Sequence, residues 1–297
     1  MYAMTQGRKD NLTCGVLNQL RTVSLMQRKS SILGVVTLLI ATLVFSAGIV
    51  AAHEVGVEST EYYGPSGGLF YKDPDYGFIV LMNLENSIED AAGFCNKLGD
   101  DGWSKEFNED DYSAYEEHFK QASLGGIDSS WIDAVDFAYY AGHGLPTGFY
   151  FNNNHDDKKL RCRDNHHDAE WGNTDLEWIA LHCCEILSDN NTHGEWYERW
   201  AFDVFKGLHQ IQGFCTVAMD VHNMGSTFAD YMIDLEYTIR ESWREAAEDT
   251  QPSDTVVAIL GVSDSGYNTW NDHLWGHGSV ASDKSDPSNF YRVMYTV

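Results

Sequence analysis

Mainly apolar, strand-like runs alternate with segments of helical periodicity along most of the chain after residue 52. Five runs have the length of a buried strand, and they cover residues 78–82, 134–141, 177–184, 210–219 and 255–260. Four segments place their apolar residues on one helical face, and they cover residues 87–99, 110–122, 195–206 and 226–248. We expect a last strand at 291–297. The alternation predicts an α/β fold with a mostly parallel sheet and helices on both faces, in one domain over residues 55–297.

The N-terminal part of the chain has the pattern of an export signal. Residues 30–52 carry no charge and are dominated by Leu, Val, Ile and Ala, and Arg28 and Lys29 directly precede them. A basic flank, an apolar run and a small-residue end at Ala52 describe a secretory signal peptide. The run also reaches the ~20 residues that span a bilayer, so an uncleaved anchor is the alternative. We therefore expect a leader at residues 1–52 and an exported protein, secreted or anchored at the outer face of the cell membrane.

The charge of the chain is strongly acidic once the leader is set aside. The leader holds five of the 19 Lys and Arg residues and one of the 45 Asp and Glu residues, so 14 and 44 remain and their net charge is −30. A surface this negative repels nucleic acid and anionic membranes. We expect neither as a partner, apart from a membrane that an uncleaved leader would enter. High solubility explains the charge, and attraction of cationic substrates is the alternative explanation.

Five of the six cysteines follow the leader, and their number is odd. An odd count in an exported protein leaves at least one cysteine without a partner in its own chain. The sequence contains no Cys-x-x-Cys pair, which argues against a zinc ribbon or a thioredoxin-like site. The cysteines in question are Cys95, Cys162, Cys183, Cys184 and Cys215.

Reactive side chains follow two of the predicted strands. The strand at 134–141 is followed by Gly142, His143 and Gly144, and the strand at 177–184 ends in Cys183 and Cys184. Ligand sites in open parallel sheets lie beyond the carboxyl ends of the strands. An imidazole near a thiol there can take the thiol proton or protonate a leaving group. Flanking glycines let a substrate approach closely and leave backbone amides free to hold an oxyanion.

These residues resemble the caspase–gingipain–legumain superfamily of cysteine peptidases, in which one apolar strand ends in His-Gly and another ends in a small residue and Cys. The wider pattern is similar to an exported, caspase-like domain family of unknown function. The segments that carry this second resemblance are 115–119, 136–144, 178–187, 207–209 and 275–278.

The resemblance implies a role for each matching residue. His143 corresponds to the acid–base histidine, Cys184 to the nucleophile and Gly144 to the glycine whose neighbouring amides hold the oxyanion. It also implies a three-layer caspase-like fold and an endopeptidase that cleaves a peptide or protein substrate with no required cofactor. Asp220, after the fourth strand, is a candidate to line a pocket for a cationic side chain, as acidic residues do in Arg- or Lys-specific relatives.

The chain departs from the peptidase pattern just before the predicted nucleophile. The peptidases commonly have an acidic residue and then Ala there, whereas this chain has His182 and Cys183. Cys184 fits the register better, and Cys183 is the alternative nucleophile. Only one of the two can face His143, because adjacent strand residues point to opposite sides. A vicinal disulfide between them is a further alternative.

A rival site lies in the polar stretch at 145–176, which we expect to form a long loop or small excursion. Carboxylates and imidazoles in such a loop can bind Zn²⁺ or Ca²⁺. The resemblance makes structural calcium an alternative for this stretch, because some relatives in the superfamily bind it. The sequence contains neither an HExxH helix nor EF-hand spacing, so a solvated acidic loop is the simpler interpretation. The candidate ligands are His155, Asp156, His166, His167 and Asp168.

Three hypotheses follow from the sequence. The leading one is an exported cysteine hydrolase, an endopeptidase that uses His143 and Cys184. The second is a catalytically inactive binding module with the same fold, which serves an exported complex. The third is a metal-binding protein or metal-dependent hydrolase that uses the loop at 155–168.

Overall fold

The structure, a computed structural model, describes residues 52–152, 157–189 and 192–297. Contacts join residues 52–297 into one compact unit. The predicted leader lies outside the described residues apart from Ala52. Every helix in the described part of the chain is too short or too polar to cross a bilayer.

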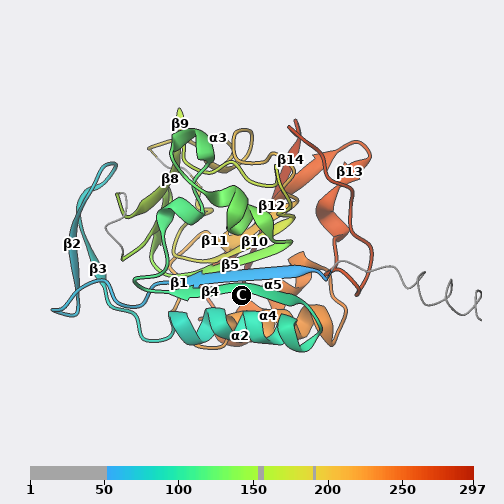
Figure 1. The fold of residues 1–297 in the computed structure, drawn as a ribbon, viewed down its shortest axis with the longest axis horizontal. Coiled ribbons are helices and arrows are strands. Elements are labelled where there is room, and N and C mark those ends of the chain that lie inside the picture. The colour runs from blue at the N-terminus through green and yellow to red at the C-terminus, as the bar shows by residue number, and fades with distance from the viewer. Residues whose placement is uncertain (1–51, 153–156, 190–191) are drawn as a thin grey trace, which may run out of the picture. The chain divides into compact units, whose positions relative to one another are not determined.

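The core of the fold is an eight-stranded mixed sheet that is mostly parallel (Figure 1). Strands β4, β1, β5, β10 and β11 are parallel neighbours in that order, and β12 continues the sheet antiparallel to β11. Strands β13 and β14 both pair antiparallel with β12. The sheet strands are β1 (Glu54–Ser59), β4 (Ser104–Asp110), β5 (Phe137–Ala141), β10 (Trp178–His182), β11 (Gln210–Phe214), β12 (Val256–Asp264), β13 (Tyr267–Asn268) and β14 (Phe290–Thr296).

Three helices cover one face of this sheet: α2 (Ser87–Asp100), α4 (Met224–Ile233) and α5 (Ile239–Thr250) (Figure 1). Alternate residues of the parallel strands point to that side and pack with the apolar stripes of the helices. Phe94 of α2 stacks on Phe228 of α4 with ring centroids 5.7 Å apart, and both rings are buried. The predicted α/β class with a mostly parallel sheet is therefore confirmed.

The other face is covered mainly by irregular structure. Helix α3 (Trp196–Trp200), four short 3₁₀ turns and a small four-stranded sheet enclose a second core there. The polar stretch expected to be a loop or excursion contains this small sheet, whose strands are β6 (Gly144–Leu145), β7 (Gly148–Tyr150), β8 (Lys159–Arg163) and β9 (His166–His167). The described residues contain four α-helices, so the prediction of helices on both faces holds only with one short helix on this side.

The apolar run at 78–82 forms a strand, but outside the central sheet. It is β3 (Gly77–Met82), which pairs antiparallel with β2 (Gly68–Asp73) in a hairpin beyond the carboxyl end of β1 (Figure 1). Phe78 is 81% exposed, so the expectation of a buried strand was wrong. An apolar run indicates residues that favour burial, but it does not show which part of the protein they pack against or whether they are buried at all.

Three predicted helices also differ from the structure, and the one expected at 195–206 is only the short α3. Residues 110–122 contain the end of β4 and the 3₁₀ turn Glu116–His118, because the backbone turns at Asp111 with a φ of 42°. The long helix expected at 226–248 is divided into α4 and α5. Helix α4 ends at Ile233. Thr238 is the N-cap of α5, because its side chain accepts a hydrogen bond from the amide of Glu241.

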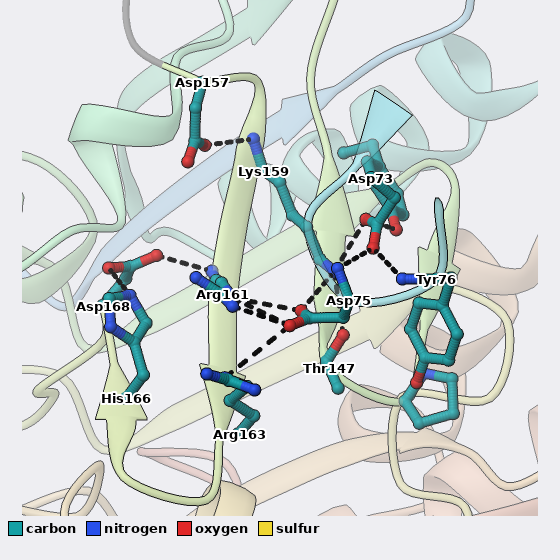
Figure 2. A network of polar contacts seen from close by, with 12 residues as sticks. Asp73, Asp75, Tyr76, Thr147, Asp157, Lys159, Arg161, Arg163, His166 and Asp168 are labelled. Carbon is teal, nitrogen blue, oxygen red and sulfur yellow. Dashed lines mark hydrogen bonds and ion pairs between the residues drawn. The ribbon is translucent and has the colours of Figure 1, made fainter. Parts of the chain in front are cut away.

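A buried network of charges holds the turn of the hairpin against β8 (Figure 2). The ammonium of Lys159 lies 2.8 Å from a carboxylate oxygen of Asp73 and 3.1 Å from one of Asp75, and all three side chains are fully buried. It also donates to the hydroxyl of Thr147 at 2.8 Å. Arg161 adds a 2.7 Å contact to Asp75. Each buried charge therefore has an opposite partner, and the hairpin has a fixed position beside the ends of β1 and β5.

Candidate active site

The predicted histidine and cysteine occupy matching positions at the ends of two neighbouring strands. Ala141 and His182 are paired residues at the carboxyl ends of β5 and β10. His143 and Cys184 each lie two residues beyond that pair. The parallel register therefore brings them to the same edge of the sheet, as the sequence predicted.

Both side chains line one pocket of about 290 Å³. Its walls come from the start of α2, from the segments that follow β5 and β10, and from the segment that follows β11. The lining residues are Leu84, Ser87, Gly142, His143, His182, Cys184, Val217, Ala218, Met219 and Asp220.

The imidazole of His143 is held by the hairpin. Its Nε2 lies 2.7 Å from the carbonyl oxygen of Met82, and because a carbonyl only accepts, Nε2 carries the proton. Nδ1 is then the basic nitrogen. Burial lowers the pKa of His143 below its usual value, against the opposing effects of Met82 and the charge of Asp220. The ring of Tyr63 lies 4.8 Å from the imidazole, centroid to centroid, and its hydroxyl accepts the amide proton of His143.

The thiol of Cys184 is half-buried and donates to the carbonyl of Ala218, with sulfur and oxygen 3.7 Å apart. Burial raises the pKa of the thiol above its usual value. In the described part of the chain, no hydrogen bond joins the thiol to the ring of His143. At rest the pair therefore consists of a neutral thiol and a neutral imidazole in one pocket.

The neighbouring Cys183 faces the opposite side of the sheet. It is 1% exposed and packs in the core under the small sheet, and burial raises the pKa of its thiol well above the ordinary value. The five cysteines in the described ranges are free thiols, so Cys183 and Cys184 are not joined by a disulfide. Of the two, Cys184 is the one that reaches the pocket.

Gly144 packs directly against Cβ of Cys183 and the backbone of Cys184. A Cβ at this position would lie 2.7 Å from Cβ of Cys183 and 2.9 Å from the carbonyl oxygen of Cys184. Only glycine permits this approach. Glu185, which follows Cys184, has a left-handed backbone with a φ of 56°, and its amide donates to Thr216 at 2.9 Å. Strained backbone of this kind occurs frequently at functional sites.

A second imidazole, that of His182, forms the floor of the pocket. Its Nδ1 lies 2.8 Å from a carboxylate oxygen of Asp90, and its Nε2 lies 3.0 Å from the carbonyl of Met219. Both nitrogens face acceptors, so both carry protons. Burial alone would lower the pKa of His182, but the charge and hydrogen bond of Asp90 outweigh burial and raise it. His182 is therefore a buried cation with no lone pair for a proton, so it is not a base.

The same carboxylate organises the helix and the strand beside the pocket. Asp90 also accepts a 2.6 Å hydrogen bond from the hydroxyl of Tyr139 and a 2.7 Å bond from the amide of Gly225. Asp90 was not among the site residues predicted from the sequence. The available signal was an acidic residue at position i−4 from Phe94, on the buried face of the predicted helix.

Asp220 lines the pocket, and its carboxylate is already engaged. One oxygen accepts the amides of Glu85 at 2.7 Å and Asn86 at 3.2 Å, and the other lies 3.4 Å from the hydroxyl of Ser87. Asp220 thus ties the segment after β11 to the start of α2. Its role toward a cationic substrate stays a prediction.

The candidate metal loop is described only in part, because His155 and Asp156 lie outside the described residues. The ring of His166 lies 3.1 Å from one carboxylate oxygen of Asp168, whose other oxygen accepts the amide of Arg161. His167 contacts the carbonyl of Glu198 at 2.7 Å. Among the described residues these side chains do not form a group of three metal ligands. The third hypothesis therefore stays a prediction for the whole loop.

A family model described as a domain of unknown function (DUF6345) matches residues 75–295, which is well over half of the chain. The match includes β5, β10, α2 and the complete lining of the pocket. No curated protein matches the sequence of this chain.

Proposed function

The chain belongs to the DUF6345 family, and we propose that this member is a cysteine hydrolase, an endopeptidase in which Cys184 is the nucleophile and His143 the base. One observation carries the proposal. The half-buried thiol and a histidine with a free basic nitrogen line the same pocket, at register-matched positions of two parallel strands. The other imidazole in the pocket, His182, has both nitrogens occupied and cannot take the proton.

The geometry supports attack by a thiol that loses its proton during the reaction. The sulfur of Cys184 bonds to the carbonyl carbon of a peptide while its proton moves to Nδ1 of His143. The peptide C–N bond then breaks, and the imidazolium gives the proton to the leaving amine. Water hydrolyses the thioester in the second half of the reaction. The buried cation of His182 stabilises negative charge on the sulfur, and amides beside Gly144 and Cys184 hold the oxyanion.

We further propose that the fold is of the caspase–gingipain–legumain type. Support comes from the parallel order of β1, β5 and β10 with helices on one side, and from the His-Gly and Cys positions at the ends of β5 and β10. An experimental structure whose strand order differed from that superfamily would contradict this part of the proposal.

Export of the chain is a proposal that rests on the apolar pattern of residues 30–52. N-terminal sequencing of the protein recovered from the medium, or from the outer face of the membrane, tests it. Recovery of the chain only inside the cell would contradict it.

Peptide cleavage tests the activity, with the full chain incubated with a pool of peptides and the products identified by mass spectrometry. Cys184→Ser and His143→Ala should each lower cleavage by at least about a thousandfold, because nucleophile and base act as a unit. Cys215→Ser is the matched control, since Cys215 is also half-buried and also donates to a carbonyl, that of Leu187. Cleavage that survives Cys184→Ser would overturn the assignment.

A non-catalytic binding module is the second candidate, and one observation favours it. The ring of His143 is bonded to Met82 rather than to the thiol, and the pKa of Cys184 is raised. A module of this kind would cleave no peptide in the pool, would retain a peptide in the pocket, and would show no change in that binding when Cys184 is replaced by Ser.

A further inference from the structure

The amino-terminal edge of the central sheet carries a row of carboxylates. Glu54, Asp136 and Glu177 directly precede Val55, Phe137 and Trp178, which are in register across β1, β5 and β10. These three apolar residues pack on the side of α2, α4 and α5. The carboxylates, each one position earlier, therefore point together to the opposite face.

Three carboxylates at this edge lie close enough to share one ion. Oxygen atoms of Glu54, Asp136 and Asp175 all lie within 4.8 Å of one another. A Ca²⁺ ion binds oxygen ligands at about 2.3–2.6 Å, so two ligands of one ion are separated by up to about 5 Å. The three groups satisfy that condition, and they are the only such group of three in residues 52–152, 157–189 and 192–297.

Glu177 supplies an independent observation that points to a ligand. Its side chain is only 7% exposed, and its buried Oε2 has no hydrogen-bond partner. The amide of Glu177 donates to the carbonyl of Asp136 at 3.1 Å, so the two residues are adjacent across the strands and their side chains share a face. A buried carboxylate oxygen without a donor is costly unless a cation faces it.

Asp136 lies at the centre of this group. Its Oδ2 accepts the amide of Glu54 at 2.6 Å, and its Oδ1 lies 3.1 Å from Nδ1 of His53. Each oxygen keeps a further lone pair for a cation. Ionised carboxyl groups this close repel one another, and a divalent cation would remove that repulsion.

We propose that Glu54, Asp136 and Asp175 bind one Ca²⁺ ion at the amino edge of the sheet, and that Glu177 faces the same ion. The ligands are all carboxylate oxygens, which are hard ligands that suit Ca²⁺ rather than Zn²⁺. They come from two strand ends and a loop, an irregular set that fits the flexible coordination of Ca²⁺ better than the octahedron of Mg²⁺. The site lies at the end of the strands opposite to Cys184 and does not depend on the proposed hydrolase activity.

Calcium titration of the full chain tests the site. The purified protein is stripped with chelator and titrated calorimetrically with CaCl₂ up to about 5 mM, a range that includes extracellular calcium modules. We expect one Ca²⁺ per chain and a higher unfolding temperature with the ion. Asp175→Asn should weaken binding about tenfold or more, because it removes a charged ligand. Asp175 is exposed, so this variant keeps the fold.

Asp254→Asn is the matched control, because Asp254 is likewise an exposed loop aspartate, and it should bind Ca²⁺ as the wild type does. Glu177→Gln tests the fourth carboxylate and should also weaken binding. Saturable binding that Asp175→Asn leaves unchanged would overturn the proposal and point to another place, such as the loop at 155–168. A chain that binds no Ca²⁺ in this range, or binds Mg²⁺ equally well, would overturn it too.

Discussion

The two edges of the central sheet are built by the same parallel strands and carry opposite chemistry. At the carboxyl edge, β5 and β10 lead to imidazoles and thiols, and the buried charge of His182 has Asp90 as its partner. At the amino edge, the same strands begin with carboxylates that face one another. A parallel sheet gathers all strand ends of one polarity at one edge. At the carboxyl edge the buried charge therefore has a full partner within the protein. At the amino edge His53 contacts only one of the carboxylates, Asp136, at 3.1 Å, and the proposed cation would balance the others.

The carboxyl edge is also supported by the hairpin of β2 and β3. The hairpin contacts His143 through Met82 at one end and is fixed by Lys159 at the other. Lys159→Met should therefore lower the free energy of unfolding by about 4 kcal/mol, because it leaves the buried carboxylates of Asp73 and Asp75 without their ammonium partner. Chemical denaturation measures the loss.

Lys97→Met is the control for that variant, because Lys97 pairs with Asp230 and both side chains are 42% exposed. Exposed pairs of this kind contribute about 0–1 kcal/mol. Equal losses in the two variants would contradict the role given to the buried network.

Acid should weaken the same network. Burial alone would raise the pKa of Asp73, but the hydrogen bonds of Lys159 and Tyr150 outweigh it and lower the pKa. A carboxyl with a lowered pKa in the fold stabilises the protein above its unfolded pKa of about 3.9, and that stabilisation is lost as the pH falls further. Denaturation at a series of pH values should show a steeper loss below pH ~4 in the wild type than in Lys159→Met. Parallel curves would contradict the prediction.

The ion pair under the pocket gives the next largest effect. Asp90→Asn removes the partner of the buried imidazolium of His182, and we expect a loss of about 3 kcal/mol in unfolding free energy. Glu89→Gln is the neighbouring control, because Glu89 is exposed in the same helical turn, and it should change stability by less than about 1 kcal/mol. A loss of similar size in both variants would show that helix charge, and not the ion pair, is responsible.

Gly144→Ala tests the packing that places Cys184. The added methyl group would overlap Cβ of Cys183 and the carbonyl oxygen of Cys184, and it should cost about 1–3 kcal/mol. A displaced nucleophile should also slow peptide cleavage about tenfold or more. Gly93→Ala in α2 is the control. Its Cβ would lie 3.2 Å from the side chain of Ser226, so this position is less crowded than Gly144. Full activity in Gly144→Ala would contradict the proposed oxyanion geometry.

Glu177→Gln should have the smallest effect on stability of these variants. It changes the amino edge of the sheet alone. In metal-free buffer we expect a change within about 0.5 kcal/mol, because the buried oxygen of Glu177 has no hydrogen bond to lose. With Ca²⁺ present, the variant should gain less stability than the wild type. Thermal unfolding with and without Ca²⁺ measures both. A large loss in metal-free buffer would mean that Glu177 has a structural partner.

The sequence predicted the parts of the fold that depend on local pattern. The strands β5, β10, β11 and β12 overlap segments that the sequence predicted as strands, and α2 has its apolar residues on one face and ends one residue after Gly99. The positions of His143 and Cys184 at one edge follow from these strands and from parallel pairing.

The remaining features depend on contacts between residues far apart in the chain. Asp90 and His182 are 92 positions apart, and His143 and Met82 are 61 apart. Periodicity carries no information on such pairs. The short strand β1 was missed although its valines alternate with other residues, since Gly56 between them weakens a strand signal. In the segment 110–122, the buried contact of His118 with Glu58 replaces the helix that local spacing indicated.

Reaction of two matched cysteines with one reagent tests the central claim most directly. Cys184 and Cys215 are both half-buried, both donate to a carbonyl, and burial raises the pKa of both thiols. A pool of peptidyl acyloxymethyl ketones is allowed to react with the full chain, and mass spectrometry gives the rate at each cysteine. We predict that Cys184 reacts at least about a hundredfold faster than Cys215, and that His143→Ala removes this advantage. Equal rates at the two cysteines, or an advantage that survives His143→Ala, would contradict the account.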